Sequence, residues 1–428
     1  MPPSKAAPRK RLWLISLPLI LAIALCGTGY TLYEHSIAPP ADSPSEGQSR
    51  QAQTNVIHAS LSAQQQRQNA INTVLAGQSA ALLAGNRARF LSTADRSAWQ
   101  VKTWLADRFT SLPAMGVTTW NAAAGDVIAD RGHWNTSLNV TYCFATTCAR
   151  PSSIHLRSVW NFDDPAHPVL SDISDAAFEV PPPWMTSVLR ATTGSRVVVA
   201  ATTAYDSQIP RVLAAAQAAA KVTDTYATTR PGRYIIYLAD SHDWATWPTA
   251  GESPWVAGMA TPAQESVILR MPTLRPGELT SLLRHEMGHI ATLAEETATA
   301  GKVDSWWLRE GLAEYIAYEG APFSSYAGAT NRAAVGNFVR GTWKGDINVD
   351  EPAVTASDRD VTARYGTAFL SVSCLIHQYG RTNTLNFFHQ VADTGQPATE
   401  AAPNTLRQPW PNINTTCADR IRHTAHAA

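Results

Sequence analysis

One short segment constrains the fold of this 428-residue chain more than any other: His285-Glu286-Met287-Gly288-His289. It lies in a run, residues 276–296, whose apolar residues recur at helical spacing. Histidines at positions i and i+4 of one helix direct their imidazoles to a common point, as a tetrahedral zinc ion requires of its first two ligands. The segment therefore predicts a helix with one apolar face and one metal-binding face. Taken alone, the motif also arises by chance on ordinary amphipathic helices.

A second acidic segment follows at a suitable distance. Twenty residues separate His289 from Glu310, enough for the first helix to end and for a second, starting near Ser305, to return antiparallel. Glu310 and Glu314 share one helix face, so one can ligate the metal while the other orients a ligating imidazole. Gly311 lacks a side chain that would keep the two helices apart. A solvated acidic face on a surface helix is the alternative.

The motif HEMGH and the segment WWLREGLAEY together resemble the gluzincin metallopeptidases, which include thermolysin and the aminopeptidase N-like enzymes. The resemblance implies a thermolysin-like domain with a small sheet and two metal-bearing helices, a Zn2+ cofactor and hydrolysis of peptide bonds. It implies that His285, His289 and Glu310 are zinc ligands. Glu286 is then the general base that takes a proton from the attacking water. The metzincin pattern is excluded, because it needs glycine and histidine where this chain has Thr292 and Glu295.

A further match begins at Tyr365 and runs to Gly380. It is similar to a helix of the aminopeptidase N-like enzymes that starts with a tyrosine and ends with a glycine. By that resemblance Tyr365 donates a hydrogen bond to the oxyanion that forms during hydrolysis. A phenol suits this role because it can donate without titrating near neutral pH. A tyrosine that only packs at a helix start is the alternative.

The segment before the metal helix predicts the means of substrate binding. Residues 264–271 read as a strand after a hairpin at 255–260, and an edge strand near the zinc would pair with an extended peptide. Aminopeptidases of this group carry a glutamate that grips the substrate N-terminus, whereas the comparable residues 258–261 contain none. This favours an endopeptidase or a protease of narrow specificity. Strands at 196–200 and 234–238 complete a small sheet.

The N-terminus contains a long apolar segment. Residues 12–33 carry no formal charge, and a helix needs roughly 20 apolar residues to cross a bilayer. Four basic residues precede it within positions 5–11, which predicts a cytoplasmic N-terminus. We therefore expect a single-pass protein of the cell membrane whose catalytic domain is extracellular. A cleaved signal peptide and a lipoprotein signal ending at Cys26 are the alternatives.

The chain as a whole predicts an α+β fold in several parts. Helical periodicity after residue 56 gives way to alternation of apolar and polar residues around 138–144, so two helices precede an antiparallel sheet. This part resembles small domains of the nuclear-transport-factor-2 or cystatin type, which bind ligands or act as spacers. The expected divisions are a cytoplasmic tail (1–11), the membrane helix (12–33), a flexible linker (34–55), a small α+β domain (56–178), the metallopeptidase domain (179–395) and a C-terminal tail (396–428).

Four cysteines follow the apolar segment, namely Cys143, Cys148, Cys374 and Cys417. An even number in an oxidising compartment suggests disulfides, and four cysteines allow three pairings. We favour Cys143 with Cys148 across a short hairpin, and Cys374 with Cys417 near the C-terminus. Four buried free thiols are the alternative.

Composition excludes two classes of protein. Lys plus Arg and Asp plus Glu are both 34, so no net positive charge attracts nucleic acid. The chain contains 14 Trp, 12 Tyr and 10 Phe, and that much aromatic surface must be buried in a folded protein. The expected partners are a peptide or protein substrate and, through the N-terminal helix, the membrane. A non-catalytic binding protein on the same fold, and a first domain that binds a partner for cleavage, are the competing hypotheses.

Overall fold

In the computed structural model, the described residues are 46–148, 150–175, 181–247, 253–275, 277–293 and 304–426, with side chains described from residue 63. The chain forms two units, Met1–Ile57 and His58–Ala428. Helix α1 (Glu46–Leu83) begins in the first unit, inside the segment 34–55 that was expected to be a linker, and the elements that follow it all belong to the second unit.

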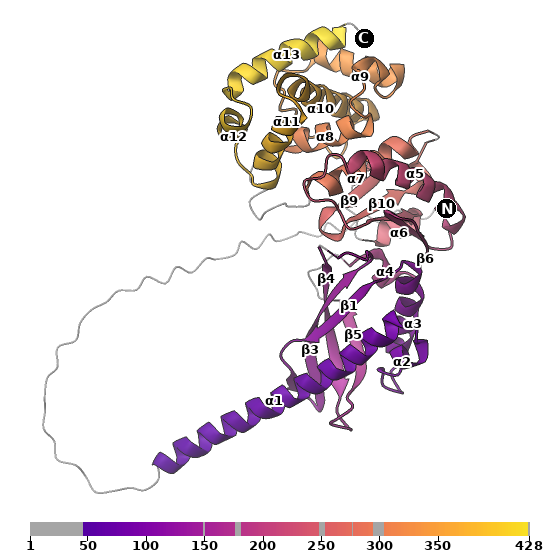
Figure 1. The fold of residues 1–428 in the computed structure, drawn as a ribbon, viewed down its shortest axis with the longest axis vertical. Helices are drawn as coiled ribbons and strands as arrows, with labels where there is room; N and C mark the ends of the chain where they lie inside the picture. The colour runs from indigo at the N-terminus through magenta and orange to yellow at the C-terminus, as the bar shows by residue number, and fades with distance from the viewer. Residues whose placement is uncertain are drawn as a thin grey trace, which may run out of the picture. The chain divides into compact units, whose positions relative to one another are not determined.

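The first part of the fold is a set of helices followed by an antiparallel sheet (Figure 1). Its sheet has the order β1-β3-β4-β5, with β2 paired to β3. The predicted alternation is confirmed, since Leu138, Val140 and Tyr142 on β3 are all buried while Asn139 is exposed. The elements after α1 are α2 (Arg87–Leu91), α3 (Trp99–Ala114), β1 (Thr119–Ala124), β2 (Ile128–Asp130), β3 (His133–Cys143), β4 (Ser152–Asn161) and β5 (Val169–Asp175).

A second sheet supports the candidate site. Its order is β6-β7-β8-β10-β9, in which β7, β8 and β10 run parallel while β6 and β9 are antiparallel to their neighbours. The predicted strand at 264–271 is present as β10, but β9 covers its outer side and forms the edge of the sheet. The elements are α4 (Pro183–Thr186), β6 (Arg190–Thr193), β7 (Val197–Ala201), α5 (Ile209–Thr223), β8 (Tyr234–Ala239), α6 (Ser241–Thr246), β9 (Gly258–Thr261) and β10 (Ser266–Arg270).

Both faces of this second sheet are buried, which explains why its inner strands read as continuous apolar runs. On β7, Val197 and Val199 face the cluster formed with α5 and α7. Val198 and Ala200 point to the other face and join the hydrophobic core of the first sheet. The two sheets therefore share one hydrophobic core.

The remainder of the described chain is helical. Ser357 caps the N-terminus of α10 by accepting a hydrogen bond from the Asp360 N–H, and Gly380 follows its C-terminus. The residues 396–428, expected to be a tail, contain two helices. The elements are α7 (Leu279–Thr292), α8 (Trp306–Ala317), α9 (Gly328–Gly341), α10 (Asp358–Tyr379), α11 (Arg381–Phe388), α12 (Ala398–Thr405) and α13 (Trp410–His426).

Glycines at two helix contacts allow close approach. A side-chain carbon on Gly311 of α8 would lie 2.8 Å from the Ala368 carbonyl carbon and 2.8 Å from Val372 Cγ2, both on α10. Gly311 therefore allows α8 to pack on α10, and not on the first metal helix as the sequence suggested. At the contact between α7 and α8 the close approach is provided by Gly288, on which a side-chain carbon would lie 3.3 Å from Ile316 Cδ1.

Both favoured cysteine pairings are confirmed. Cys143 pairs with Cys148, and Cys374 on α10 pairs with Cys417 on α13. The second disulfide fixes the last helix to the helix that carries Tyr365.

The predicted membrane helix and the single-pass localisation derived from it require correction. The segment 12–33 lies outside the described residues. Among the described residues, no helix is both long and apolar enough to cross a bilayer. Only α1 and α10 exceed 17 residues there; α1 is rich in glutamine, and α10 carries charged residues that a bilayer interior would not accommodate. The fold class is thus α+β without a membrane-spanning helix in its described part, and no membrane anchor enters the proposals below.

Candidate metal centre

Helix α7 presents the two histidines of the motif. Leu283, Met287 and Ile290 are completely buried against the second sheet, which fixes the rotation of the helix about its axis. His285 and His289 then lie one turn apart on another face, with ring centroids 4.8 Å apart.

Helix α8 brings a carboxylate to the same point. Leu308 and Leu312 are buried in the C-terminal helical core, while Glu310 lies on the side of α8 that meets α7. Glu310 Oε2 lies 3.0 Å from His285 Nε2 and 3.4 Å from His289 Nε2. The predicted antiparallel return of the second helix therefore brings all three expected ligands together.

The donor atoms match the size of a tetrahedral zinc site. Bonds of about 2.0–2.1 Å to nitrogen and oxygen give a tetrahedron whose ligand atoms are about 3.3 Å apart. The three separations are 3.0 Å, 3.4 Å and, between the two Nε2 atoms, 3.2 Å. Two imidazoles and one carboxylate are also a ligand set that zinc accepts. The residues present therefore fit the metal that the resemblance implies.

Glu314 orients the first histidine, as the spacing predicted. Its Oε1 lies 2.9 Å from His285 Nδ1, and because a carboxylate only accepts, Nδ1 carries the proton and Nε2 faces the common point. The other oxygen accepts a hydrogen bond from the Tyr326 hydroxyl at 2.7 Å. Burial, together with the charge of Glu314, raises the pKa of Tyr326 well above its usual value, so the phenol remains a donor.

The charges of the centre are strongly coupled. Burial lowers the pKa of His285, but its hydrogen bonds to Glu310 and Glu314 outweigh this and raise that pKa well above normal. Burial alone would raise the pKa of Glu310, yet the neighbouring imidazoles hold it well below its usual range. The pocket thus stabilises positive charge at the common point, and a dication there would replace the proton on His285 Nε2.

Glu286 lies beside the three ligand atoms and is 6% exposed. Burial raises the pKa of its carboxyl. The nearby imidazoles of His285 and His289 lower that pKa, but they offset only part of the rise. The backbone of β9 closes over it: a side-chain carbon on Gly258 would lie 2.7 Å from Glu286 Oε1, and the Ala260 backbone hydrogen-bonds to the carboxylate. Gly258 is therefore required for this strand to approach the candidate base.

Tyr365 also reaches the centre. Its ring centroid lies 6.0 Å from that of His285, 5.1 Å from Trp306 and 6.3 Å from Trp255. Burial and then the charge of Glu310 raise its pKa well above normal, which keeps the phenol protonated. The sequence predicted a helix that starts at Tyr365. In the structure α10 begins earlier, at Asp358, so Tyr365 lies about two turns inside the helix.

Two cavities, of about 500 Å³ and about 220 Å³, border the centre. All three candidate ligands, His285, His289 and Glu310, line the larger cavity, so the candidate metal position belongs to it. The smaller cavity shares Trp255, Gly258, Glu286 and Tyr365 with the larger one. A ligand in the larger cavity would therefore lie directly beside the candidate metal centre.

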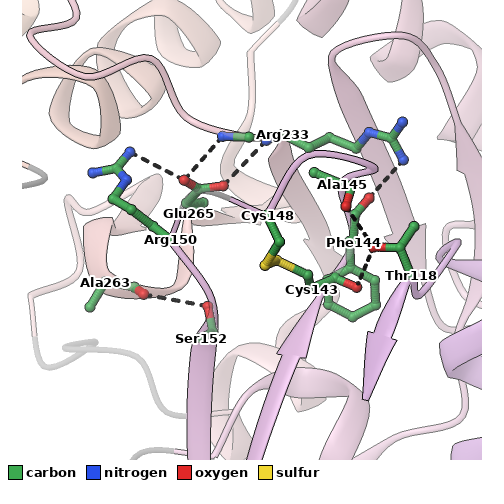
Figure 2. Close-up of a disulfide and its surroundings, with 11 residues drawn as sticks. Thr118, Cys143, Phe144, Ala145, Cys148, Arg150, Ser152, Arg233, Ala263 and Glu265 are labelled. Carbon is green, nitrogen blue, oxygen red and sulfur yellow. Dashed lines mark hydrogen bonds and ion pairs between the residues drawn. A yellow bond between two sulfur atoms is a disulfide. The ribbon is translucent and has the colours of Figure 1, made fainter. Parts of the chain in front are cut away.

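The turn between β9 and β10 is fixed to its neighbours through Glu265. This residue has a left-handed backbone conformation, with φ of +50°. Its carboxylate accepts hydrogen bonds from the backbone N–H groups of Gly232 and Arg233 at 3.1 and 3.2 Å, and pairs with Arg150 at 3.1 Å. Figure 2 shows Glu265 between the two arginines.

The disulfide Cys143–Cys148 closes a short loop that Arg233 contacts and that Arg150 follows in sequence. Arg233 donates from its guanidinium to the Phe144 carbonyl at 2.8 Å, and the Thr118 hydroxyl donates to the Ala145 carbonyl at 2.6 Å (Figure 2). The edge strand beside the candidate metal centre is thus tied to a cross-linked loop of the first sheet.

Comparisons with known proteins do not identify a family: no protein-family model matches the chain, and no curated protein matches it. The structure brings together His285, His289, Glu310, Glu286, Glu314 and Tyr365, all predicted from the sequence. It adds Tyr326 and Glu351, which lie outside the motif segments and carry no spacing signal. It also places Trp255 and Gly258, from the segment expected to form a hairpin before the metal helix, in the lining of the site.

Proposed function

We propose that the protein is a zinc-dependent peptidase. The observation that carries this proposal is the triangle of two imidazole nitrogens and one carboxylate oxygen, with sides of 3.0, 3.2 and 3.4 Å. A chance motif on a surface helix would not be completed by a carboxylate from a second helix at ligand distance. The solvated acidic face considered for Glu310 is also disfavoured by its position against two buried imidazoles.

The roles of the surrounding residues follow from their positions. Zinc held by this triangle would supply a Lewis acid and make a water molecule more acidic. Glu286 would take the proton of the attacking water and deliver it to the leaving amine, since its raised pKa brings it closer to the range of a general base. Tyr365 would donate to the developing oxyanion, and Glu314 with Tyr326 would hold His285 in the ligating orientation.

An extended peptide is the substrate that the site accommodates best. Strand β9 forms the sheet edge next to Glu286 and offers backbone groups for pairing. The larger cavity, lined by all three candidate ligands, gives room for a peptide beside the centre. Residues 258–261 lack the glutamate that aminopeptidases of this type use, which supports internal cleavage of peptides.

Metal content tests the first part of the proposal. Elemental analysis of the purified full-length chain should find one zinc per molecule, and Glu310→Ala should lose it. Glu400→Ala on α12, distant in sequence from the centre, is the matched control and should retain zinc. A folded wild-type protein that takes up no zinc would refute the assignment.

Cleavage of a mixed peptide library, followed by mass spectrometry, tests the second part. The wild-type protein should cut peptides internally, and Glu286→Gln should keep zinc while losing cleavage by about 10²–10⁴-fold, the usual contribution of a general base. An unchanged rate would contradict the role of Glu286. Zinc binding without any cleavage would favour the non-catalytic binding protein instead.

A further inference from the structure

One carboxylate in the larger cavity has no role in the chemistry proposed above. Glu351 lies in the segment between α9 and α10 and lines the cavity of about 500 Å³ that contains His285, Glu286 and Tyr365. Among the described residues, its side chain makes no hydrogen bond or ion pair. A carboxylate in this position is available to a ligand.

The backbone around Glu351 is well fixed. Val349 and Pro352 on either side of it are buried, and the Arg364 guanidinium donates to the Asp350 carbonyl at 2.9 Å. The backbone position of Glu351 is therefore set by the fold of the helical part and by the contact of Asp350 with α10, while its side chain is exposed.

The charges that act on Glu351 are negative. Partial burial raises the pKa of its carboxyl, and the carboxylates of Glu310 and Asp304 raise it further. Arg309 also lines the cavity, and no ion pair joins it to Glu351. Zinc bound at the centre would offset the charge of Glu310, while Asp304 and Glu351 would still attract a cation.

The other walls of the cavity near the centre are aromatic. Trp255 and Trp306 line it together with Tyr365, whose ring centroid lies 6.3 Å from that of Trp255 and 5.1 Å from that of Trp306. The cavity thus combines apolar walls suited to a side chain with a carboxylate suited to a charged group.

We propose that Glu351 recognises a positively charged group of the substrate beside the scissile bond, so that the enzyme selects peptides carrying a cation there. This inference rests on the peptidase function proposed above. The cation is either a lysine or arginine side chain or the free N-terminal amine of the peptide. The first source makes the protein an endopeptidase with basic specificity, and the second would make it an aminopeptidase with Glu351 in place of the glutamate that residues 258–261 lack.

Matched peptides test the proposal on the zinc-loaded full-length protein. One arm compares internally quenched peptides of a single scaffold that differ by lysine, norleucine or glutamate at one position at a time. The other arm compares free and acetylated N-termini on the norleucine scaffold. We expect kcat/KM to be about tenfold higher for the cationic member of one arm, because each factor of ten corresponds to about 1.4 kcal/mol of charge recognition. The arm that responds identifies the source of the cation.

The variant Glu351→Gln removes the charge and keeps the shape of the side chain. It should bring kcat/KM for cationic and neutral peptides to within about twofold of each other. Glu400→Gln on α12 is the control and should keep the wild-type preference. Equal cleavage of cationic and neutral peptides by the wild-type, or an undiminished preference in Glu351→Gln, would overturn the proposal.

Calorimetric binding of the same peptides separates this proposal from the peptidase function. If no peptide is cleaved, the proposed function fails. A cation preference in binding that disappears in Glu351→Gln would still support the role of Glu351. Cation-independent binding, or no binding, would overturn it.

Discussion

Replacing Gly311 by alanine tests whether the close contact between α8 and α10 positions the metal centre. The added carbon would lie 2.8 Å from both the Ala368 carbonyl carbon and Val372 Cγ2, and closer still to the Ala368 carbonyl oxygen. Favourable separations of carbon atoms are about 3.5–4.0 Å, so the two helices must move apart by roughly 0.7 Å or more. Because the nearest atoms belong to the backbone of a helix, no side-chain rotation can relieve the clash.

The size of the effect can be estimated from two opposing terms. Overpacking of this kind costs about 1–3 kcal/mol, and a rigid backbone partner places Gly311→Ala near the upper end. Replacing glycine by alanine inside a helix recovers about 1 kcal/mol. The net loss is about 2 kcal/mol, which for a chain of this length lowers the unfolding temperature by about 2–3 °C. Glu310 precedes Gly311, so zinc affinity should fall as well.

The assay is thermal unfolding followed by circular dichroism, together with a zinc titration. Gly341→Ala is the matched control, because Gly341 ends helix α9 and an added carbon there meets no atom within 4 Å. This variant should unfold at the wild-type temperature or slightly above it and bind zinc normally. If Gly311→Ala kept both its unfolding temperature and its zinc affinity, the argument that this glycine positions α8 would be refuted.

Three further substitutions have expected outcomes. Gly258→Ala places a carbon 2.7 Å from Glu286 Oε1, so cleavage should fall at least tenfold while zinc content stays at one per chain; loss of zinc would contradict this. Glu314→Ala removes the partner of a ligating imidazole and should weaken zinc binding 10- to 100-fold in a competition titration, and an unchanged affinity would refute its orienting role. Replacing Cys374 and Cys417 together by serine opens a cross-link between residues 43 apart, so denaturant unfolding should show a loss of about 4 kcal/mol; no loss would show that packing alone holds α13.

The sequence predicted the parts of the site that depend on local spacing. A helix sets the direction of residues four apart, so His285 and His289, and likewise Glu310 and Glu314, had to share a face. The alternation of apolar residues on β3 and the continuous apolar strands β7 and β8 also follow from local burial. These signals remain within one element and need no knowledge of the rest of the fold.

The parts that depend on contacts between distant segments were not predictable. Tyr326 and Glu351 lie outside the predicted motif segments and reach the site only because the C-terminal helices pack around α8. In the second sheet β10 is an inner strand and β9 is the edge strand. This order depends on which side of β10 the preceding strand β9 pairs with, and local sequence does not specify that. The partner of Gly311 was wrongly assigned for the same reason, since the glycine itself does not indicate which helix approaches it.

The hydrophobic core shared by the two sheets affects how this protein can be divided. A gene fragment that starts near residue 179 would encode the metal-binding helices but leave Val198 and Ala200, with the rest of that sheet face, uncovered. The exposed face would favour aggregation, and Glu265 would lose Arg150. Recombination between related genes at this boundary would rarely give a working enzyme. The first sheet and the candidate peptidase part therefore have to be inherited together, and substitutions inside either one constrain those that the other can accept.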